Sequence, residues 1–232
     1  MEKSRKYDQL VYSEMRRFRD PKGNWYKNDD GKCILVRNKT RVEFGKENNL
    51  TGTVIMTNPG SFSLGRIPGW KEFEMGIGNS EFLEGYGYPD LTMRNIIFAV
   101  QQAYQNRKKI ALNGYINIYN ISSAVCPKGK AISIYHEKIL SIINENKIER
   151  FLLEHPIVHN QDEFAKVCKN SPFVLMGFLK DKFKDIAAEL LKWASTYDRL
   201  VVSADRDKWP SHPRRWKTEK ALGEKAIEVL SG

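Results

Sequence analysis

The stretch TVIMTNPGSFSLG, residues 53–65, indicates the kind of fold that this chain adopts. Its apolar run, residues 54–56, is short and stops at Asn-Pro-Gly, a sequence that continues neither a strand nor a helix. A short apolar run that ends in a turn is typical of a strand buried on both faces. The stretch therefore predicts a core strand followed by an exposed loop of small and hydroxylated residues.

Similar segments recur along the chain and alternate with amphipathic helices. Further core strands are predicted in GYINIYNI (114–121), PFVLMGF (172–178) and DRLVVSA (198–204). Helices are predicted in segments 88–109, 131–147, 160–170, 179–196 and 218–231, and Asp90 or Thr92 is expected to cap the first of them. This alternation predicts an α/β fold: a three-layer α/β/α sandwich around a central, mostly parallel four-stranded sheet.

The first fifty residues have a different pattern. They predict a polar helix and then a hairpin, with turn signals at Pro-Lys-Gly (21–23) and Asp-Asp-Gly (29–31). No linker-like stretch divides the chain, and 232 residues is an ordinary size for a single core. We therefore expect one α/β domain over residues 1–232, with an N-terminal helix/hairpin extension in residues 1–50 and the core in residues 51–232.

Composition narrows the function. Hydrophobic residues make up 41% of the chain, as expected for a globular protein. The N-terminus lacks the apolar core of a signal peptide and no apolar stretch is long enough to span a bilayer, so we expect a cytoplasmic protein without membrane contact. The three cysteines form no Cys-x-x-Cys pair, which indicates neither a metal site nor a cofactor. A net charge of +10 favours a polyanionic partner.

The loops after the predicted strands are the candidate site, because ligands of such sheets bind at the carboxyl ends of the strands. These loops are NPGSFSLGRIPGW (58–70), NISSAVCPKGK (120–130), FLKDK (178–182) and DRDKWPSHPRRW (205–216). The last loop lies in a segment, 206–225, that holds seven Lys or Arg residues against three Asp or Glu residues. This clustering strengthens the expectation of a nucleic-acid partner.

With these loops in place, residues 50–230 resemble the uracil-DNA glycosylase superfamily, in particular its branch with an Asn-Pro-Gly first motif. The resemblance rests on TNPGS (57–61), INIYN (116–120) and SHPRRW (211–216), which follow predicted core strands in the order that the superfamily has. It implies a uracil-DNA glycosylase-like fold. The same layout occurs in a related family with Asn-Pro-Ser in the first loop, so the resemblance by itself does not establish glycosylase activity.

The resemblance also implies a role for single residues. Asn58 would position the attacking water, and His212 would stabilise the departing base as a neutral hydrogen-bond donor. Asn120 would recognise the edge of a flipped base, and Trp70 would stack on it, with Phe62 and Phe73 as rivals. Each has a structural alternative: an Asx-turn for Asn58, a strand-end cap for Asn120, and a place in the core for the aromatic rings.

Two further parts of the site follow from the resemblance. Uracil-specific enzymes carry an aromatic ring at the position of Gly60, so a glycine there leaves room for a 5-substituent, although it also suits a turn with positive φ. Ser61 and Phe62 would complete the base pocket. Contacts to DNA are expected from Arg214, Arg215, Lys217, Lys128 and Lys130, and Trp216 is the expected wedge that fills the gap left by a flipped base.

These expectations combine into a monofunctional DNA glycosylase. It would flip a non-canonical, mismatched or modified pyrimidine, possibly 5-substituted, out of duplex or single-stranded DNA and hydrolyse its N-glycosidic bond, for repair or for defence against modified foreign DNA. We expect a monomer that needs no cofactor. Two alternatives stay open: a non-catalytic nucleic-acid-binding protein with the same fold, and a nucleoside or nucleotide hydrolase.

Overall fold

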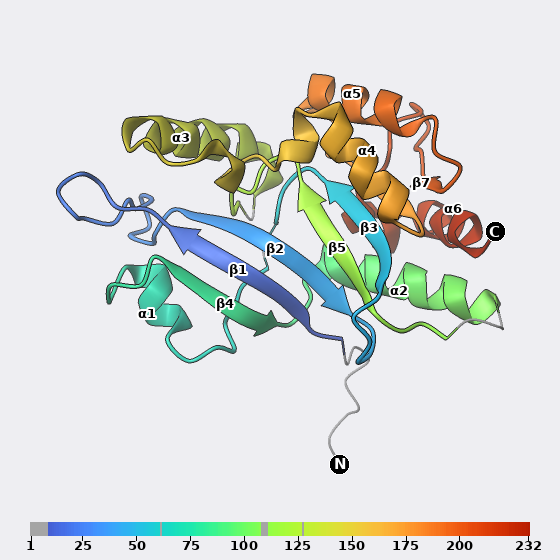
Figure 1. The fold of residues 1–232 in the computed structure, drawn as a ribbon, viewed down its shortest axis with the longest axis horizontal. Coiled ribbons are helices and arrows are strands. Elements are labelled where there is room, and N and C mark those ends of the chain that lie inside the picture. Colours follow the sequence, from blue (N-terminus) through green and yellow to red (C-terminus); the bar gives the residue numbers. More distant parts are fainter. Residues whose placement is uncertain (1–8, 61, 108–110, 127) are drawn as a thin grey trace, which may run out of the picture.

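The computed structural model describes residues 9–60, 62–107, 111–126 and 128–232 (Figure 1). The strands are β1 (Val11–Arg17), β2 (Leu35–Glu43), β3 (Leu50–Met56), β4 (Phe82–Gly87), β5 (Tyr115–Asn120), β6 (Val174–Gly177) and β7 (Leu200–Val202). The α-helices are α1 (Trp70–Met75), α2 (Leu91–Asn106), α3 (Ile132–Glu145), α4 (Gln161–Asn170), α5 (Lys184–Ala194) and α6 (Lys220–Ser231). Short 3₁₀ helices are η1 (Gly129–Ala131), η2 (Arg150–Leu152), η3 (Pro156–Val158) and η4 (Pro213–Lys217).

Seven strands form one mixed sheet in the order β4-β1-β2-β5-β3-β6-β7. β5, β3, β6 and β7 run parallel to one another, whereas β4, β1 and β2 pair antiparallel, and β2 also pairs antiparallel with β5. The α/β class is therefore confirmed, but the expected sheet of four strands is wrong. The four strands predicted from apolar runs are the parallel part of a larger sheet. The other strands were missed because a strand that is polar on one face has no continuous apolar run.

β1 takes the place of the N-terminal polar helix, and that prediction is wrong for the residues described. Val11 and Met15 are buried in the core, while Tyr12 and Arg16 alternate with them on the other face and are only partly buried. β1 lies between β2 and β4, so its backbone hydrogen bonds are satisfied on both edges. The hairpin prediction is confirmed, because β1 and β2 pair antiparallel through the intervening turns.

Helices cover both faces of the parallel part of the sheet, which gives three layers there (Figure 1). Val54 and Met56 of β3 pack in one cluster with α2 and α6, and Ile55 packs in another with α4 and α5. A third cluster joins α3 to Ile34 and Val36, at the start of β2. Within the described ranges, no helix has both the length and the apolarity that crossing a bilayer requires.

The carboxyl ends of the parallel strands are joined at one edge of the sheet. The Ile121 N–H, just after β5, donates to the carbonyl of Met56 at the end of β3 over 2.8 Å. Phe178, just after β6, forms a parallel bridge with Ser211 in the loop that follows β7. The loops after β3, β5, β6 and β7 therefore meet at this edge, where a parallel sheet normally binds its ligand.

Candidate active site

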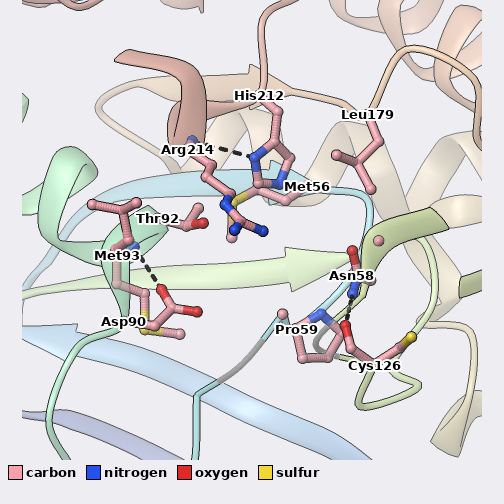
Figure 2. Close-up of a pocket in the computed structure, with 13 residues that line it drawn as sticks. Met56, Asn58, Pro59, Asp90, Thr92, Met93, Cys126, Leu179, His212 and Arg214 are labelled. Carbon is pink, nitrogen blue, oxygen red and sulfur yellow. Dashed lines mark hydrogen bonds between the residues drawn. The ribbon is translucent and has the colours of Figure 1, made fainter. Parts of the chain in front are cut away.

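A pocket of about 90 Å³ opens at this edge (Figure 2). It is lined by the end of β3 and the loop behind it, the start of α2, the loop after β5, and the loop that leads into η4. Its polar side chains are Asn58, Asp90, Thr92, His212 and Arg214. The volume is that of several water molecules, since one water needs roughly 10–15 Å³. The pocket thus brings together residues that lie more than 150 positions apart in the chain.

Asn58 is held in one orientation at the end of β3. Its side chain is buried, and its Nδ2 donates to the carbonyl of Cys126, in the loop after β5, over 3.1 Å. Among the described residues no group donates to its Oδ1, and no Asx-turn bond to Gly60 is formed. The amide oxygen is an acceptor that can orient a water at the pocket.

His212 enters the pocket as a neutral imidazole. It precedes η4, and its Nδ1 accepts a hydrogen bond from the backbone N–H of Arg214 over 3.3 Å (Figure 2). Burial, and after it the positive charge of Arg214, lower the pKa of His212 to about 4. Because Nδ1 is an acceptor, the single proton of the neutral ring is on Nε2, which becomes the hydrogen-bond donor.

Gly60 adopts the left-handed backbone conformation that favours glycine, with φ of 69°. A Cβ built at this position would lie 3.1 Å from Oδ2 of Asp90. The space beside Gly60 is therefore bounded by a carboxylate rather than open, and any larger residue at this position would combine backbone strain with this contact. The expectation of free room for a 5-substituent is not met at this wall of the pocket.

Asp90 is a site residue that the sequence reasoning missed, and Arg37, which lines a separate groove, is a buried charge that it also missed. Asp90 was expected only as a helix cap, and its Oδ1 does accept from the Met93 N–H at the start of α2, over 3.0 Å. The sequence did contain one signal for a role of Asp90 in the site, because this residue directly precedes a helix that starts at the ligand-binding edge of the sheet. Arg37, on β2, is completely buried and packs on Phe62, with its guanidinium carbon 4.9 Å from the ring centre. A buried arginine leaves no such signal in the sequence.

Four other predicted base-binding residues that the structure describes do not line the pocket. Phe62, Trp70 and the rival Phe73 are buried in the hydrophobic core, and Ser61 lies outside the described residues. Asn120 is buried, and its Oδ1 has no hydrogen-bond partner among the described residues. It lines a separate groove of about 1020 Å³ formed by β1, β2 and β5. A base in the pocket would therefore not meet Phe62, Trp70, Phe73 or Asn120 in the present arrangement.

The expected DNA contacts divide into two groups. Arg214 lines the pocket, and Lys128, Lys130 and Lys217 are exposed, as contacts to phosphate require. Arg215, in contrast, is bound to Asp205 and to Glu219 on opposite sides, with N···O distances of 2.7 and 2.8 Å. Its charge is already neutralised, so it is a poor phosphate contact.

The wedge expectation for Trp216 is contradicted by its burial. Its side chain is 6% exposed and belongs to the core cluster that contains α2 and α6. Its indole Nε1 donates to Ser211 Oγ over 3.0 Å, so the polar edge of the ring is also satisfied inside the protein. A side chain that fills the core cannot at the same time enter the base stack.

Comparisons of the chain with protein-family models, with curated proteins and with solved structures find no match. In the part of the chain that the structure describes, no cluster of His, Cys, Asp and Glu side chains is arranged to hold a metal ion. The chemistry of the pocket must therefore be inferred from its own groups: an oriented amide oxygen, a neutral imidazole donor, a guanidinium and a carboxylate.

Proposed function

We propose that this protein is a monofunctional DNA glycosylase that hydrolyses the N-glycosidic bond of a non-canonical or modified pyrimidine, acting in the cytoplasm as a monomer. The observation that carries the proposal is the meeting of Asn58, His212 and Arg214 at the carboxyl edge of the parallel strands. Hydrolysis needs an oriented water that attacks the sugar, and it needs hydrogen-bond donors for a base that leaves as an anion. Asn58 suits the first requirement, and His212 and Arg214 suit the second.

The protonation state of His212 supports this assignment. A pKa of about 4 keeps the ring neutral at physiological pH, so Nε2–H can donate to the departing base without first being ionised. The Arg214 guanidinium adds a positive charge that is permanent at neutral pH to the same pocket. Asn58 contributes orientation only, because an amide is too weak a base to remove a proton from water.

The surface favours DNA whose target base is already unpaired. The chain carries a net charge of +10, and Lys128, Lys130 and Lys217 are exposed. The buried Trp216, however, leaves the site without the expected wedge for a duplex. We therefore propose single-stranded or mismatched DNA as the preferred substrate, because unstacking such a base costs less than extracting a paired one.

The test is base release from a panel of oligonucleotides that contain uracil, mismatched thymine or 5-hydroxymethylcytosine, each as a single strand and as a duplex. Free base is measured by chromatography, and abasic sites are measured by alkaline cleavage. We expect release from at least one DNA, faster from the single strand, with no adduct trapped by borohydride because the enzyme is monofunctional. Asn58→Ala and His212→Ala are expected to lower the single-turnover rate by about two orders of magnitude each.

Arg214 and Arg215 provide a matched pair for the binding step. Arg214→Ala is expected to weaken DNA binding and to reduce the salt dependence of the binding constant by about one phosphate contact. Arg215→Ala removes a guanidinium that is already paired with Asp205 and Glu219, so its effect on DNA binding should be smaller. Tight binding without release of any base would instead support a non-catalytic nucleic-acid-binding protein.

A nucleoside or nucleotide hydrolase is the second candidate. It is favoured by the same burial of Trp216 and pairing of Arg215, since a free nucleotide requires neither a wedge nor an extended phosphate-binding surface. Incubation with free pyrimidine deoxynucleosides and deoxynucleotides distinguishes the two. Release from these small substrates, with none from the oligonucleotides, would replace the first proposal by the second.

A further inference from the structure

One carboxylate of the pocket has no role in the hydrolysis proposed above. Asp90 is the one acidic side chain that lines the pocket, among the residues described. Its Oδ1 is fixed by the Met93 N–H over 3.0 Å, so the carboxylate cannot rotate freely. Its Oδ2 accepts no hydrogen bond within the described residues and faces the backbone of Gly60, at 3.1 Å from where a Cβ would be.

The pocket has two acceptor oxygens, one from the Asp90 carboxylate and one from the Asn58 amide, and they belong to different walls. In Figure 2, Asp90 and Asn58 lie on opposite sides of the pocket, and the Arg214 guanidinium extends between them from η4. Water in the pocket can donate a hydrogen bond to the Asn58 amide oxygen or to the Asp90 carboxylate. Only the carboxylate is basic enough to take a proton as the water attacks. The donors, His212 and Arg214, are then left for the departing base.

Arg37 is a buried cation that lines the groove containing Asn120 and whose charge interacts with that of Asp90. Its Nε, Nη1 and Nη2 have no hydrogen-bond partner among the described residues. Burial lowers the pKa of Arg37 to about 10, an effect that the negative charge of Asp90 opposes, so the side chain stays protonated at neutral pH. A buried charge costs less when an opposite charge acts on it, and Asp90 is the acidic group whose charge acts on Arg37, although the two side chains form no ion pair.

We propose that Asp90 is the catalytic base of this site. The inference rests on the proposed N-glycosyl hydrolase activity. As the water oxygen bonds to C1′ of the sugar, the C1′–N bond breaks and its electron pair leaves with the base. Asp90 takes the proton of the water, and the base anion, held by His212, is protonated afterwards. The products are the free base and an abasic sugar, which balances hydrolysis by one water.

Asp90→Asn tests this role, because asparagine caps a helix about as well as aspartate does. The substrate is the single-stranded oligonucleotide from which the wild-type protein releases base most rapidly. We expect the single-turnover rate of Asp90→Asn to fall by about 100-fold or more, while DNA binding is retained. Asp162→Asn is the matched control, because Asp162 is an exposed aspartate in the first turn of α4, on the other face of the sheet.

Chemical rescue separates catalysis from structure. In Asp90→Ala, added sodium formate can enter the vacated space and take the proton, so the rate should rise with formate concentration. The Asp162→Asn control should show no such rise. Because removal of Asp90 leaves the Arg37 cation uncompensated, the double variant Asp90→Asn/Arg37→Met is also measured. It should recover the thermal stability of the wild type and remain inactive.

If wild type releases base and both Asp90→Asn and the double variant stay within about threefold of its rate, the inference is overturned and the proposed function stands. Absence of release by wild type from every DNA overturns both.

Discussion

His212 shows how one residue couples catalysis to pH. Its ring is buried, its Nδ1 accepts from the Arg214 backbone, and its pKa is lowered to about 4. The imidazole should therefore stay neutral in the folded protein at pH values where an ordinary histidine, with a pKa of 6.5, becomes charged. This shift has consequences for both activity and stability.

We expect the His212 ring to titrate near pH 4 by NMR. Because the folded-state pKa lies below the unfolded-state value of 6.5, the unfolded chain binds the proton first. The contribution of His212 to stability is therefore complete above pH 6.5 and decreases as the pH falls towards 4. The free energy of unfolding, measured from pH 7.5 to 4, should decrease less steeply for His212→Gln than for the wild type. Parallel curves would contradict the shift.

At the scale of elements, η4 is fixed between α2 and α6 by one aromatic side chain. Trp216 is buried in the cluster of these helices, and its β-carbon would lie 3.3 Å from a Cβ at Gly223 of α6. Gly223 thus allows α6 to approach η4 closely. The side chain that the loop sequence suggested for the DNA surface is instead part of the attachment of the loop to the core.

Trp216→Ala should therefore destabilise the protein by about 3–5 kcal/mol, as removal of a large buried aromatic side chain does. Trp216→Phe preserves most of the volume and loses the bond to Ser211, so its cost should be smaller. Urea unfolding followed by tryptophan fluorescence and circular dichroism measures both. Wild-type stability of Trp216→Ala, combined with a selective loss of duplex binding, would restore the wedge hypothesis.

A second element-scale feature ties the loop after β5 to α3. Glu154, just after η2, accepts hydrogen bonds from His136 of α3, from Arg150 and from His159. The other nitrogen of His136 lies 2.9 Å from Oγ of Ser122. The resulting Ser-His-Glu series resembles a catalytic triad, but Ser122 is completely buried and no substrate can reach its hydroxyl. It is a structural connection that holds the loop carrying the Cys126 carbonyl.

Glu154→Gln should weaken this connection and make the protein less sensitive to acid. Burial raises the pKa of Glu154, but the hydrogen bonds from His136, Arg150 and His159 outweigh it and lower the pKa to about 2. The stabilisation is therefore complete above the ordinary value of 4.5 and is lost as the pH falls through 2. Thermal unfolding at pH 7 and pH 3 should show a lower midpoint for Glu154→Gln at pH 7 and a smaller difference from wild type at pH 3.

At the scale of the whole molecule, the N-terminal strands belong to the sheet that carries the site. β2 pairs with β5, and Val11, Met15, Leu35 and Val42 are buried in the same cluster as α2. β2 also supplies Arg37, a buried cation whose charge interacts with that of Asp90. The first fifty residues therefore contribute to the core of the protein.

Deletion of residues 1–49 should abolish the fold. It would expose the edge of β5, remove buried apolar side chains from the core, and leave Asp90 without Arg37. We expect the truncated chain to aggregate and to show no cooperative thermal transition by circular dichroism, whereas the full chain unfolds cooperatively. A cooperative transition in the truncated chain would show that residues 50–232 fold as an independent core.

Local sequence patterns predicted the elements whose signal is short-range. β3, β5, β6 and β7 follow from apolar runs that end in turns, and α2 follows from its apolar face and its cap at Asp90. Because these strands are parallel, their loops meet at one edge, which is why Asn58, Gly60, His212 and Arg214 were correctly expected to lie together. Whether they catalyse base release stays a prediction.

The tertiary structure decided everything that depends on contacts between distant segments. A polar segment became β1 because β2 and β4 pair with both of its edges, and the sheet grew to seven strands for the same reason. Trp216 became core rather than surface because α2 and α6 enclose it. The charge of Asp90 acts on the buried Arg37 cation of β2, which lies more than fifty positions earlier in the chain. Sequence periodicity shows which face of a segment is apolar. It does not show which other segment covers that face, and burial and charge interactions depend on that second segment.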